Sequence, residues 1–329
     1  MRVFVTGATG FIGREVVRDL IAHGHQVVGL ARSEQSAAAL RAAGAAPHAG
    51  SVRDLDSLRR GAAEADGVIH LAFTFSFADM PMARRLKVFL GGGPWGIMGR
   101  AMAAIAQTDR EAIDALGGAL QDSGRPLVTT FGVMGLAGGP GEAALRPATE
   151  ADPPNPRSAG YGRAQTESAV SGWASRGVRA SIVRLAPSVH GAGDKGLVPI
   201  LIGAARKRGE AVYVGEGNNT WCGVHRTDAA SLYRLALEKG RPGGVYHGVG
   251  DAGLSMRAIA QTIGRRLQIP AGPATLKQVR QQMSFFAPFV ATDNPATSLL
   301  TQQELGWRPT GPSLSDDLDG PAYFSPPPA

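Results

Sequence analysis

Three glycines near the amino terminus constrain the fold of this chain more strongly than any other feature of its sequence. Gly7, Gly10 and Gly13, in VFVTGATGFIG (residues 3–13), follow an apolar run and open an amphipathic segment. At this spacing the first glycine permits a tight turn, the second lets the backbone approach a pyrophosphate, and the third lets a helix pack close to a strand. Backbone N–H groups and the positive end of the helix dipole would then face the phosphate charge. The pattern predicts a strand–turn–helix unit that binds a dinucleotide.

The end of the second predicted strand indicates which dinucleotide is bound. An NAD site usually carries Asp or Glu there, to hold the 2′-hydroxyl of a ribose. In this chain the strand at 26–30 is followed by Arg32 and Ser33, and residues 30–33 contain no carboxylate. An arginine at this place can pair with a 2′-phosphate and stack on adenine. We therefore expect NADP(H) as the cofactor in preference to NAD(H).

Strand and helix patterns alternate along the first half of the chain. Short apolar runs predict strands, and segments with apolar residues on one face predict helices. The predicted strands are 2–5, 26–30, 67–72, 126–132 and 179–187, and the predicted helices are 11–24, 33–44, 54–65, 103–122 and 157–176. Such alternation is typical of parallel βαβ units. The expected fold class is α/β, a Rossmann-type doubly wound parallel sheet with a smaller C-terminal substrate-binding region.

The strand–helix alternation loosens after residue 187, where glycine-rich and polar loops surround the helical patterns. We expect a dinucleotide-binding domain over 1–187 and a mostly separate substrate region over 188–329. The segment 227–249, a predicted helix followed by a predicted strand, is expected to return to the first domain. Two further helices are predicted at 197–208 and 255–268.

Charge and cysteine content limit the classes of partner. The chain has 329 residues, a formal net charge of +7 and 43% hydrophobic residues, and its arginines are scattered as single and paired positions. A scattered basic surface argues against a nucleic-acid partner. Cys222 is the only cysteine, which excludes an internal disulfide and fits a reducing compartment. The amino terminus lacks the pattern of a signal peptide, and no apolar window is long enough for a membrane span. We expect a cytoplasmic protein without a membrane partner.

One segment, residues 73–106, has an unusual composition for a connection inside such a domain. It carries several Phe and Met residues and three consecutive glycines at 91–93. It can be a buried excursion with a glycine hinge, or an apolar lid over a substrate pocket, since long loops in compact domains are often functional. Both interpretations stay open. In either case the apolar content favours a fairly apolar substrate.

Other polar residues give weaker signals. His190, Trp221, Cys222 and His225 are low-ranking candidates for substrate contacts, because a lone histidine is more often structural. No cluster of His, Cys or carboxylate residues has the spacing of a metal site, so no metal is expected. The chain has no G-x-S-x-G nucleophile elbow, which argues against a hydrolase.

The motifs, taken in their order along the chain, resemble those of the short-chain dehydrogenase/reductase superfamily. The resemblance covers nearly the whole chain and is to the extended or atypical branch, which includes sugar-nucleotide epimerases and dehydratases, dihydroflavonol-type reductases and 3β-hydroxysteroid-dehydrogenase-like proteins. The motifs are TGATGFIG (6–13), GVIHLAF (67–73), LVTTFGVMG (127–135), YGRAQ (161–165), VRLAPSVHG (183–191), VHRTDAA (224–230) and LGWRPT (305–310).

The resemblance implies roles for individual residues. Thr130 stands where the family carries its catalytic Ser or Thr, and Tyr161 stands where it carries its catalytic tyrosine. Where the family often carries Gly-Asp, this chain has Gly50-Ser51, which lacks the carboxylate that would contact adenine. The cofactor contacts that the resemblance and the glycine pattern together imply are Gly7, Thr9, Gly10, Phe11, Ile12, Gly13, Arg32, Ser33, Ser51, Val52, Leu71, Ala72, Tyr161, Gln165, Pro187 and Val189. The family often dimerises through helices equivalent to 103–122 and 157–176, which implies a homodimer.

Gln165 is the main departure from the family pattern. The family carries Lys four residues after the tyrosine, on the same face of a helix, where it binds the nicotinamide ribose and lowers the pKa of the tyrosine. Gln can still hydrogen-bond a ribose hydroxyl but supplies no charge. Without that charge the phenol, whose ordinary pKa is about 10, remains protonated at neutral pH. This handicaps alcohol oxidation more than carbonyl reduction, because reduction needs the protonated acid.

We therefore expect an NADPH-dependent reductase for the carbonyl group of a small, fairly apolar ketone or aldehyde. Tyr161 would donate the proton and Thr130 would hydrogen-bond the same oxygen, with Gln165 as the third site residue. One alternative is a non-catalytic NADP(H)-binding sensor, which the loss of Lys would favour. A second alternative is an NAD-dependent sugar-nucleotide epimerase or dehydratase. Arg32 and Gln165 argue against it, because those reactions begin with an oxidation.

Overall fold

A computed structural model describes residues 1–73, 82, 86, 88, 90–92 and 97–324 of the chain. Most of the unusual segment between 73 and 97 therefore lies outside the described residues, and both interpretations of it stay predictions. The chain divides into two compact units. The first comprises 1–130, 162–182 and 233–244, and the second comprises 131–161, 183–232 and 245–329.

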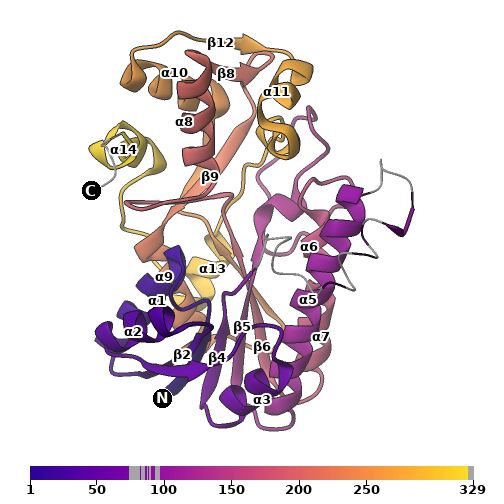
Figure 1. Ribbon diagram of the computed structural model, residues 1–329, viewed down its shortest axis with the longest axis vertical. Coiled ribbons are helices and arrows are strands. Elements are labelled where there is room, and N and C mark those ends of the chain that lie inside the picture. The colour runs from indigo at the N-terminus through magenta and orange to yellow at the C-terminus, as the bar shows by residue number, and fades with distance from the viewer. Residues whose placement is uncertain (74–81, 83–85, 87, 89, 93–96, 325–329) are drawn as a thin grey trace. The chain divides into compact units, whose positions relative to one another are not determined.

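A seven-stranded sheet runs through the fold, as Figure 1 shows. Its strands are β1 (Arg2–Thr6), β2 (Gln26–Ala31), β3 (Ala46–Ala49), β4 (Gly67–His70), β5 (Pro126–Gly132), β6 (Arg179–Leu185) and β10 (Gly244–Gly248). The strand order is β10-β6-β5-β4-β1-β2-β3, and the β1–β2, β1–β4, β2–β3 and β4–β5 pairs are parallel. This order confirms the predicted Rossmann-type α/β fold.

The chain changes the side on which it adds strands to the sheet at β1. The chain first adds β2 and β3 on one side of β1, and then adds β4 and β5 on the other. In open α/β sheets ligands bind outside the carboxyl ends of the strands at such a reversal. Because parallel sheets are covered on both faces, the central strand β1 is apolar along most of its length. Val3, Phe4 and Val5 of β1 are each 0% exposed.

The first three predicted helices form with shifts of at most two residues at their ends, and the helix predicted at 103–122 begins earlier, at Ile97. The helices that begin in the first half of the chain are α1 (Phe11–Ala22), α2 (Glu34–Ala42), α3 (Leu55–Ala63) and α5 (Ile97–Leu120). On the predicted apolar face of α1, Val16, Val17 and Leu20 are buried, whereas Ile12 and Ile21 are half-buried. The predicted serine cap of α2 is confirmed, since the Ser33 hydroxyl accepts a hydrogen bond from the Ser36 N–H.

The single helix predicted at 157–176 is wrong in its middle. The structure has two shorter helices, α6 (Tyr161–Ala164) and α7 (Glu167–Ala174), and Gln165 lies in the turn between them. Two local causes oppose a continuous helix. The Thr166 hydroxyl donates to the Arg163 carbonyl at 2.8 Å and so competes for a helix acceptor. Gly162, inside the first turn, has a low helix propensity.

The second unit contains two small sheets and most of the remaining helices. Its strands are β7 (Ser188–His190), β8 (Ala211–Val214), β9 (Thr220–His225), β11 (Asp251–Ser255) and β12 (Ala271–Ala274). They pair as β11-β9-β7 and as β12-β8. The helical elements after residue 131 that complete the chain are η3 (Val133–Leu136), α8 (Leu197–Arg208), α9 (Arg226–Lys239), α10 (Met256–Leu267), α11 (Leu276–Met283), η4 (Ser284–Phe286), α12 (Ala287–Val290), α13 (Leu299–Leu305), α14 (Leu314–Asp319) and η5 (Pro321–Tyr323).

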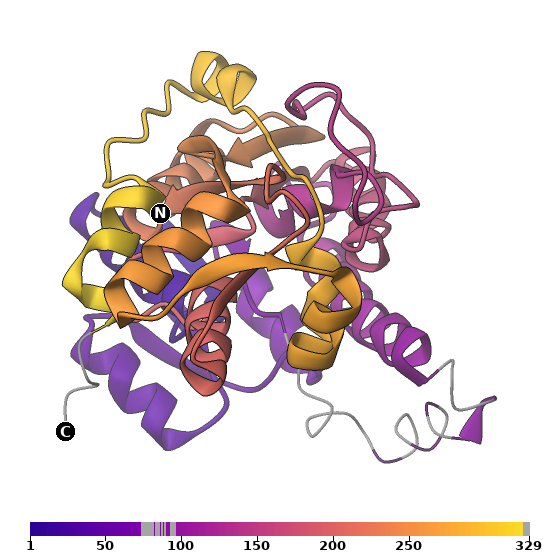
Figure 2. The ribbon, with the colours of Figure 1, turned by 90° about the horizontal axis from the view of Figure 1, so that it is seen from above.

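The core of the second unit lies where α8, α10 and α11 contact the β8–β12 pair, which Figures 1 and 2 show from two directions. Buried Ile202, Val212, Ile259 and Val279 belong to this core. The helices predicted at 197–208 and 255–268 are confirmed as α8 and α10. None of the described helices is long and apolar enough to span a bilayer.

Candidate cofactor and catalytic site

The glycine turn between β1 and α1 has a geometry that side chains would prevent. Gly7 has a φ of +70°, and a Cβ atom on it would lie 2.8 Å from the backbone nitrogen of Ala72. A Cβ atom on Gly13 would lie 2.0 Å from the Gly7 carbonyl oxygen. The turn closes with a 2.9 Å hydrogen bond from the Gly10 N–H to the same carbonyl. The close approach of β1, α1 and the residues after β4 therefore depends on Gly7 and Gly13.

The amino terminus of α1 differs from those of the next two helices. It begins after Gly10, with no capping side chain and no acidic residue in its first turn. Helices α2 and α3 are instead capped by the side chains of Ser33 and Asp54, and each has an acidic residue in its first turn. The positive end of the α1 dipole is thus left for an outside anion to compensate.

A cavity of about 410 Å³ opens beside this turn, inside the first unit. Its lining residues are Gly7, Thr9, Gly10, Leu30, Arg32, Ser36, Gly50, Ser51, Val52, Arg53, Leu71, Ala72 and Phe73. The predicted cofactor residues among them are Gly7, Thr9, Gly10, Arg32, Ser51, Val52, Leu71 and Ala72. The described lining thus holds two guanidinium groups and no carboxylate. A cavity of this size and charge fits an elongated, phosphorylated ligand.

Ser36 and Arg53 also line the cavity, although no motif of the sequence indicates them. Arg53 follows Ser51 by two residues, in the loop after β3, where only the missing acid had been considered. Ser36 lies in the first turn of α2, four residues after Arg32 in the sequence. Both could have been found by asking which polar side chains follow the carboxyl ends of β2 and β3.

The other predicted cofactor residues do not line this cavity. Phe11, Ile12 and Gly13 form the first turn of α1, and Ser33 is engaged as the cap of α2. Gln165 is exposed in the turn after α6. Tyr161, Pro187 and Val189 belong to the second unit. The predicted contacts of these residues with a cofactor stay predictions.

Polar side chains at the carboxyl ends of β1, β4 and β5 hold one another in place. The Thr6 hydroxyl lies 2.7 Å from Nδ1 of His70 and accepts from the Ala72 N–H at 3.2 Å. The Thr130 hydroxyl donates to the His70 carbonyl at 2.9 Å. Thr6, His70 and Thr130 are all buried. These hydrogen bonds hold the side chain of Thr130, the predicted catalytic threonine, next to residues that line the cavity.

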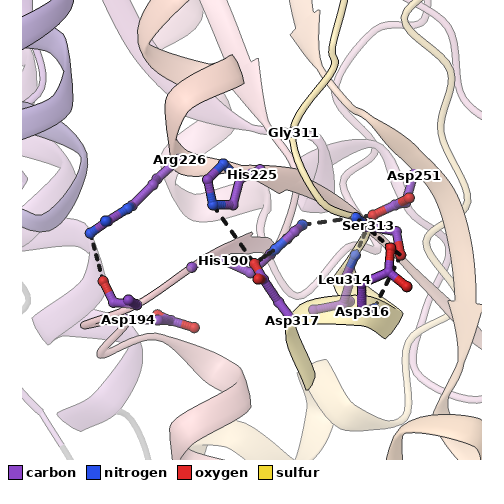
Figure 3. A network of polar contacts seen from close by, with 12 residues as sticks. His190, Asp194, His225, Arg226, Asp251, Gly311, Ser313, Leu314, Asp316 and Asp317 are labelled. Atoms are coloured by element: carbon purple, nitrogen blue, oxygen red, sulfur yellow. Dashed lines mark hydrogen bonds and ion pairs between the residues drawn. The ribbon is translucent and has the colours of Figure 1, made fainter. Parts of the chain in front are cut away.

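A second polar cluster lies within the second unit, and Figure 3 shows it from close by. His190, at the end of β7, is 0% exposed and lies between two carboxylates. Its Nδ1 is 2.6 Å from Oδ2 of Asp317 on α14, and its Nε2 is 3.7 Å from Oδ2 of Asp251 on β11. Nε2 of His225 lies 3.8 Å from the same Asp317 oxygen. The described His, Cys, Asp and Glu side chains include no group of three placed to hold a metal ion.

His190 and His225 belong to this cluster, Trp221 and Cys222 lie on β9 with His225, and the suggested contacts of all four with a substrate stay predictions. Burial lowers the pKa of His190, but the hydrogen bonds and charges of Asp251 and Asp317 have the larger combined effect. The pKa of His190 is therefore raised above its ordinary value. Burial lowers the pKa of His225 in spite of Asp317. Trp221 and Cys222 are 0% exposed, and burial raises the pKa of the Cys222 thiol. The 2.6 Å contact between Asp317 and Nδ1 of His190 thus ties α14 to β7.

Stability should depend on the ionisation of His190. Because the folded state raises its pKa, the stabilisation is complete below the unfolded pKa of about 6.5 and is lost as pH rises through the folded pKa. We expect the difference in free energy of unfolding between the wild type and His190→Gln to shrink from pH 6 to pH 9. Urea unfolding at both pH values measures it. An unchanged or growing difference would contradict a charged His190.

Comparisons with known proteins found one matching family model, relatives that are similar in sequence and solved structures that are similar in fold. Residues 3–87 match the model of the NAD dependent epimerase/dehydratase family. An uncharacterised protein of Schizosaccharomyces pombe is 44% identical over 324 residues, which cover 98% of this chain and 100% of that protein. The decarboxylating sterol-4-alpha-carboxylate 3-dehydrogenase of Dictyostelium discoideum is 27% identical over 253 residues, 74% of this chain and 70% of that protein. A dTDP-glucose 4,6-dehydratase double mutant from Streptomyces venezuelae has a similar fold, with a TM-score of 0.72 at 21% identity over 97% of this chain and 95% of that one.

Proposed function

We propose a reaction for this chain from the premise that it belongs to the NAD-dependent epimerase/dehydratase family, the extended branch of the short-chain dehydrogenase/reductase superfamily. The chain is an NAD(P)-dependent oxidoreductase of that type, and the proposed reaction is the reduction of carbonyl groups with NADPH. The proposed substrate is a small, fairly apolar ketone or aldehyde. Tyr161 is the proposed proton donor.

The proposed preference for NADPH over NADH rests on the charge of the cavity lining. The glycine cradle leaves room for a phosphate at the amino terminus of α1, which has no acidic residue in its first turn. Arg32 and Arg53 supply two positive charges to the described lining, and no carboxylate there would hold a ribose 2′-hydroxyl. These features favour a cofactor with an additional phosphate on its ribose. NADPH, when bound, supplies the hydride, and the protein must orient the carbonyl and provide the proton.

The direction of the reaction rests on Gln165. A neutral side chain at the lysine position of the family supplies no charge that would favour a phenolate. A protonated tyrosine is the form needed to donate to the developing alkoxide, and a second donor, Thr130, can stabilise the same oxygen. Phe73 lines the cavity and packs against a small apolar cluster, which supports an apolar environment for the substrate; the cluster comprises Val88, Ala101, Ala104 and Ile105.

The proposal is tested by following NADPH oxidation with a panel of ketones and aldehydes of increasing size. We expect turnover with at least some small apolar carbonyl compounds. Tight NADPH binding without turnover of any panel member would instead favour the non-catalytic sensor, and a tightly retained NAD⁺ would favour an epimerase or dehydratase.

Replacing Gln165 with Lys should shift the balance between the two directions. The added charge favours the phenolate that alcohol oxidation requires. We expect the ratio of kcat for alcohol oxidation to kcat for carbonyl reduction, both measured at saturating substrate, to rise by about tenfold, or about 1.4 kcal/mol. Initial rates in both directions at one pH measure this ratio, and Gln165→Met, which adds no charge, is the control. A ratio that stays constant in Gln165→Lys contradicts the role given to the missing charge.

A further inference from the structure

The hydroxyl of Thr130 is held on two sides by groups of its own unit. A threonine hydroxyl has one hydrogen and two lone pairs. The hydrogen points to the His70 carbonyl at 2.9 Å, and one lone pair accepts the phenol O–H of Tyr233 at 2.8 Å. In this state the hydroxyl has no hydrogen to offer to a substrate. It must turn away from His70 before it can donate to a carbonyl oxygen.

The bond from Tyr233 has a fixed direction. Tyr233 is 0% exposed, and its burial raises the pKa of its phenol even though Thr130 and Arg163 act in the opposite sense. The phenol therefore stays protonated at physiological pH and acts as the donor. A hydroxyl that accepts a hydrogen bond becomes a better donor itself, because the bonds of a chain polarise one another.

The backbone of Thr130 is fixed separately. Nη2 of Arg163 donates to the Thr130 carbonyl at 2.7 Å. The guanidinium lies 3.7 Å from the ring centre of Phe73, and its Nε is 3.9 Å from Oδ2 of the buried Asp109. These contacts hold the arginine in place, so that Thr130 can change the direction of its hydroxyl hydrogen without moving its backbone.

We propose that Tyr233 is a positioning residue of the carbonyl reduction: it keeps its hydrogen bond to the Thr130 oxygen while the Thr130 hydroxyl turns its hydrogen from the His70 carbonyl to the substrate oxygen. No covalent bond changes and no proton leaves Tyr233. Its effect is to strengthen the donor that meets the negative charge developing on the substrate oxygen. The inference rests on the proposed function, and it adds a residue that the motifs of the sequence did not indicate.

The test combines Tyr233→Phe and Thr130→Val in a double-mutant cycle. We expect Thr130→Val to lower kcat by about 100-fold, as for the loss of an oxyanion donor. Tyr233→Phe alone should lower kcat by about 3- to 10-fold, the worth of one hydrogen bond. In the Thr130→Val background the same change should lower kcat by less than about twofold, because Tyr233 acts only through the threonine hydroxyl. Thr130→Ser, which keeps the hydroxyl, should retain the dependence on Tyr233.

Two measurements on the same proteins do not depend on turnover. The dissociation constant of NADPH should stay within about twofold in all four proteins of the cycle. The losses of thermal stability should be less than additive, because both substitutions remove the same hydrogen bond. Tyr246→Phe is the matched control: this phenol is 1% exposed and donates to Glu304 at 2.6 Å, so its loss should lower the Tm without changing kcat.

The outcomes separate this inference from the proposed function. If the wild type reduces no carbonyl compound, the proposed function fails and this role of Tyr233 fails with it. If the wild type is active but Tyr233→Phe leaves kcat unchanged, or lowers it equally in both backgrounds, only the positioning role is overturned. A stability cycle that is fully additive also overturns it, because the hydrogen bond would then be absent.

Discussion

Tyr161→Phe is expected to lower kcat for carbonyl reduction by about 10²- to 10⁴-fold, the usual worth of a positioned general acid. The substitution removes only the phenolic oxygen, and with it the proton that the developing alkoxide would receive. Steady-state rates with NADPH and an accepted ketone measure the effect. The dissociation constant of NADPH should change by less than about threefold, because the charged lining of the cavity in the first unit is untouched.

Tyr213→Phe is the matched control for that experiment. Tyr213 lies on β8 of the second unit, where Cζ of Arg257 is 5.6 Å from the centre of its ring. It does not belong to the predicted site. Its replacement should leave kcat unchanged. Wild-type rates in Tyr161→Phe would remove Tyr161 from the mechanism and leave the reductase proposal without a proton donor.

Gly13→Ala should destabilise the first unit and weaken cofactor binding. The added Cβ would lie 2.0 Å from the Gly7 carbonyl oxygen and 2.9 Å from Cα of Ala8, and both of these are backbone atoms. Either α1 or the turn must move, at a cost of about 1–3 kcal/mol or more. The turn also carries Gly7 and Gly10 at the edge of the cavity, so we expect NADPH affinity to fall by more than tenfold. Thermal unfolding and fluorescence titration measure the two effects.

Gly172→Ala is the corresponding control within the same unit. Gly172 lies inside α7, and a Cβ atom on it would meet nothing within 4 Å. Alanine should therefore stabilise this helix by up to about 1 kcal/mol. If Gly13→Ala bound NADPH as tightly as the wild type, the close packing of α1 on β1 would not be what shapes the phosphate site.

The features that could be predicted from the sequence are those set by local chemistry. The glycine spacing, the apolar run before it and the amphipathic helix after it all lie within 22 residues, and the structure has β1, the turn and α1 at those places. Arg32 was found because the end of β2 is a position with a known role. The cavity beside the turn gathers half of the sixteen residues expected to contact the cofactor.

The features that could not be predicted depend on competing local bonds or on contacts between distant segments. The break after Ala164 follows from the Thr166 hydroxyl, whose bond to the Arg163 carbonyl leaves no trace in the hydrophobic pattern. The bond between Tyr233 and Thr130 joins residues 103 positions apart, and no periodicity reports such a contact. The contacts of His190 with Asp251 and Asp317 likewise join segments that lie far apart in the sequence.

A titration of the purified protein with NADPH and with NADH shows whether the glycine cradle and the two arginines select a cofactor. NADPH should bind at least about tenfold more tightly, since one charge-assisted bond to the additional phosphate contributes about 1.5–3 kcal/mol. Replacing both Arg32 and Arg53 with Ala should abolish this preference, whereas Arg60→Ala, an exposed arginine of α3 outside the cavity lining, should not. Equal affinity for the two cofactors, tighter binding of NADH, or no binding of either would contradict the account.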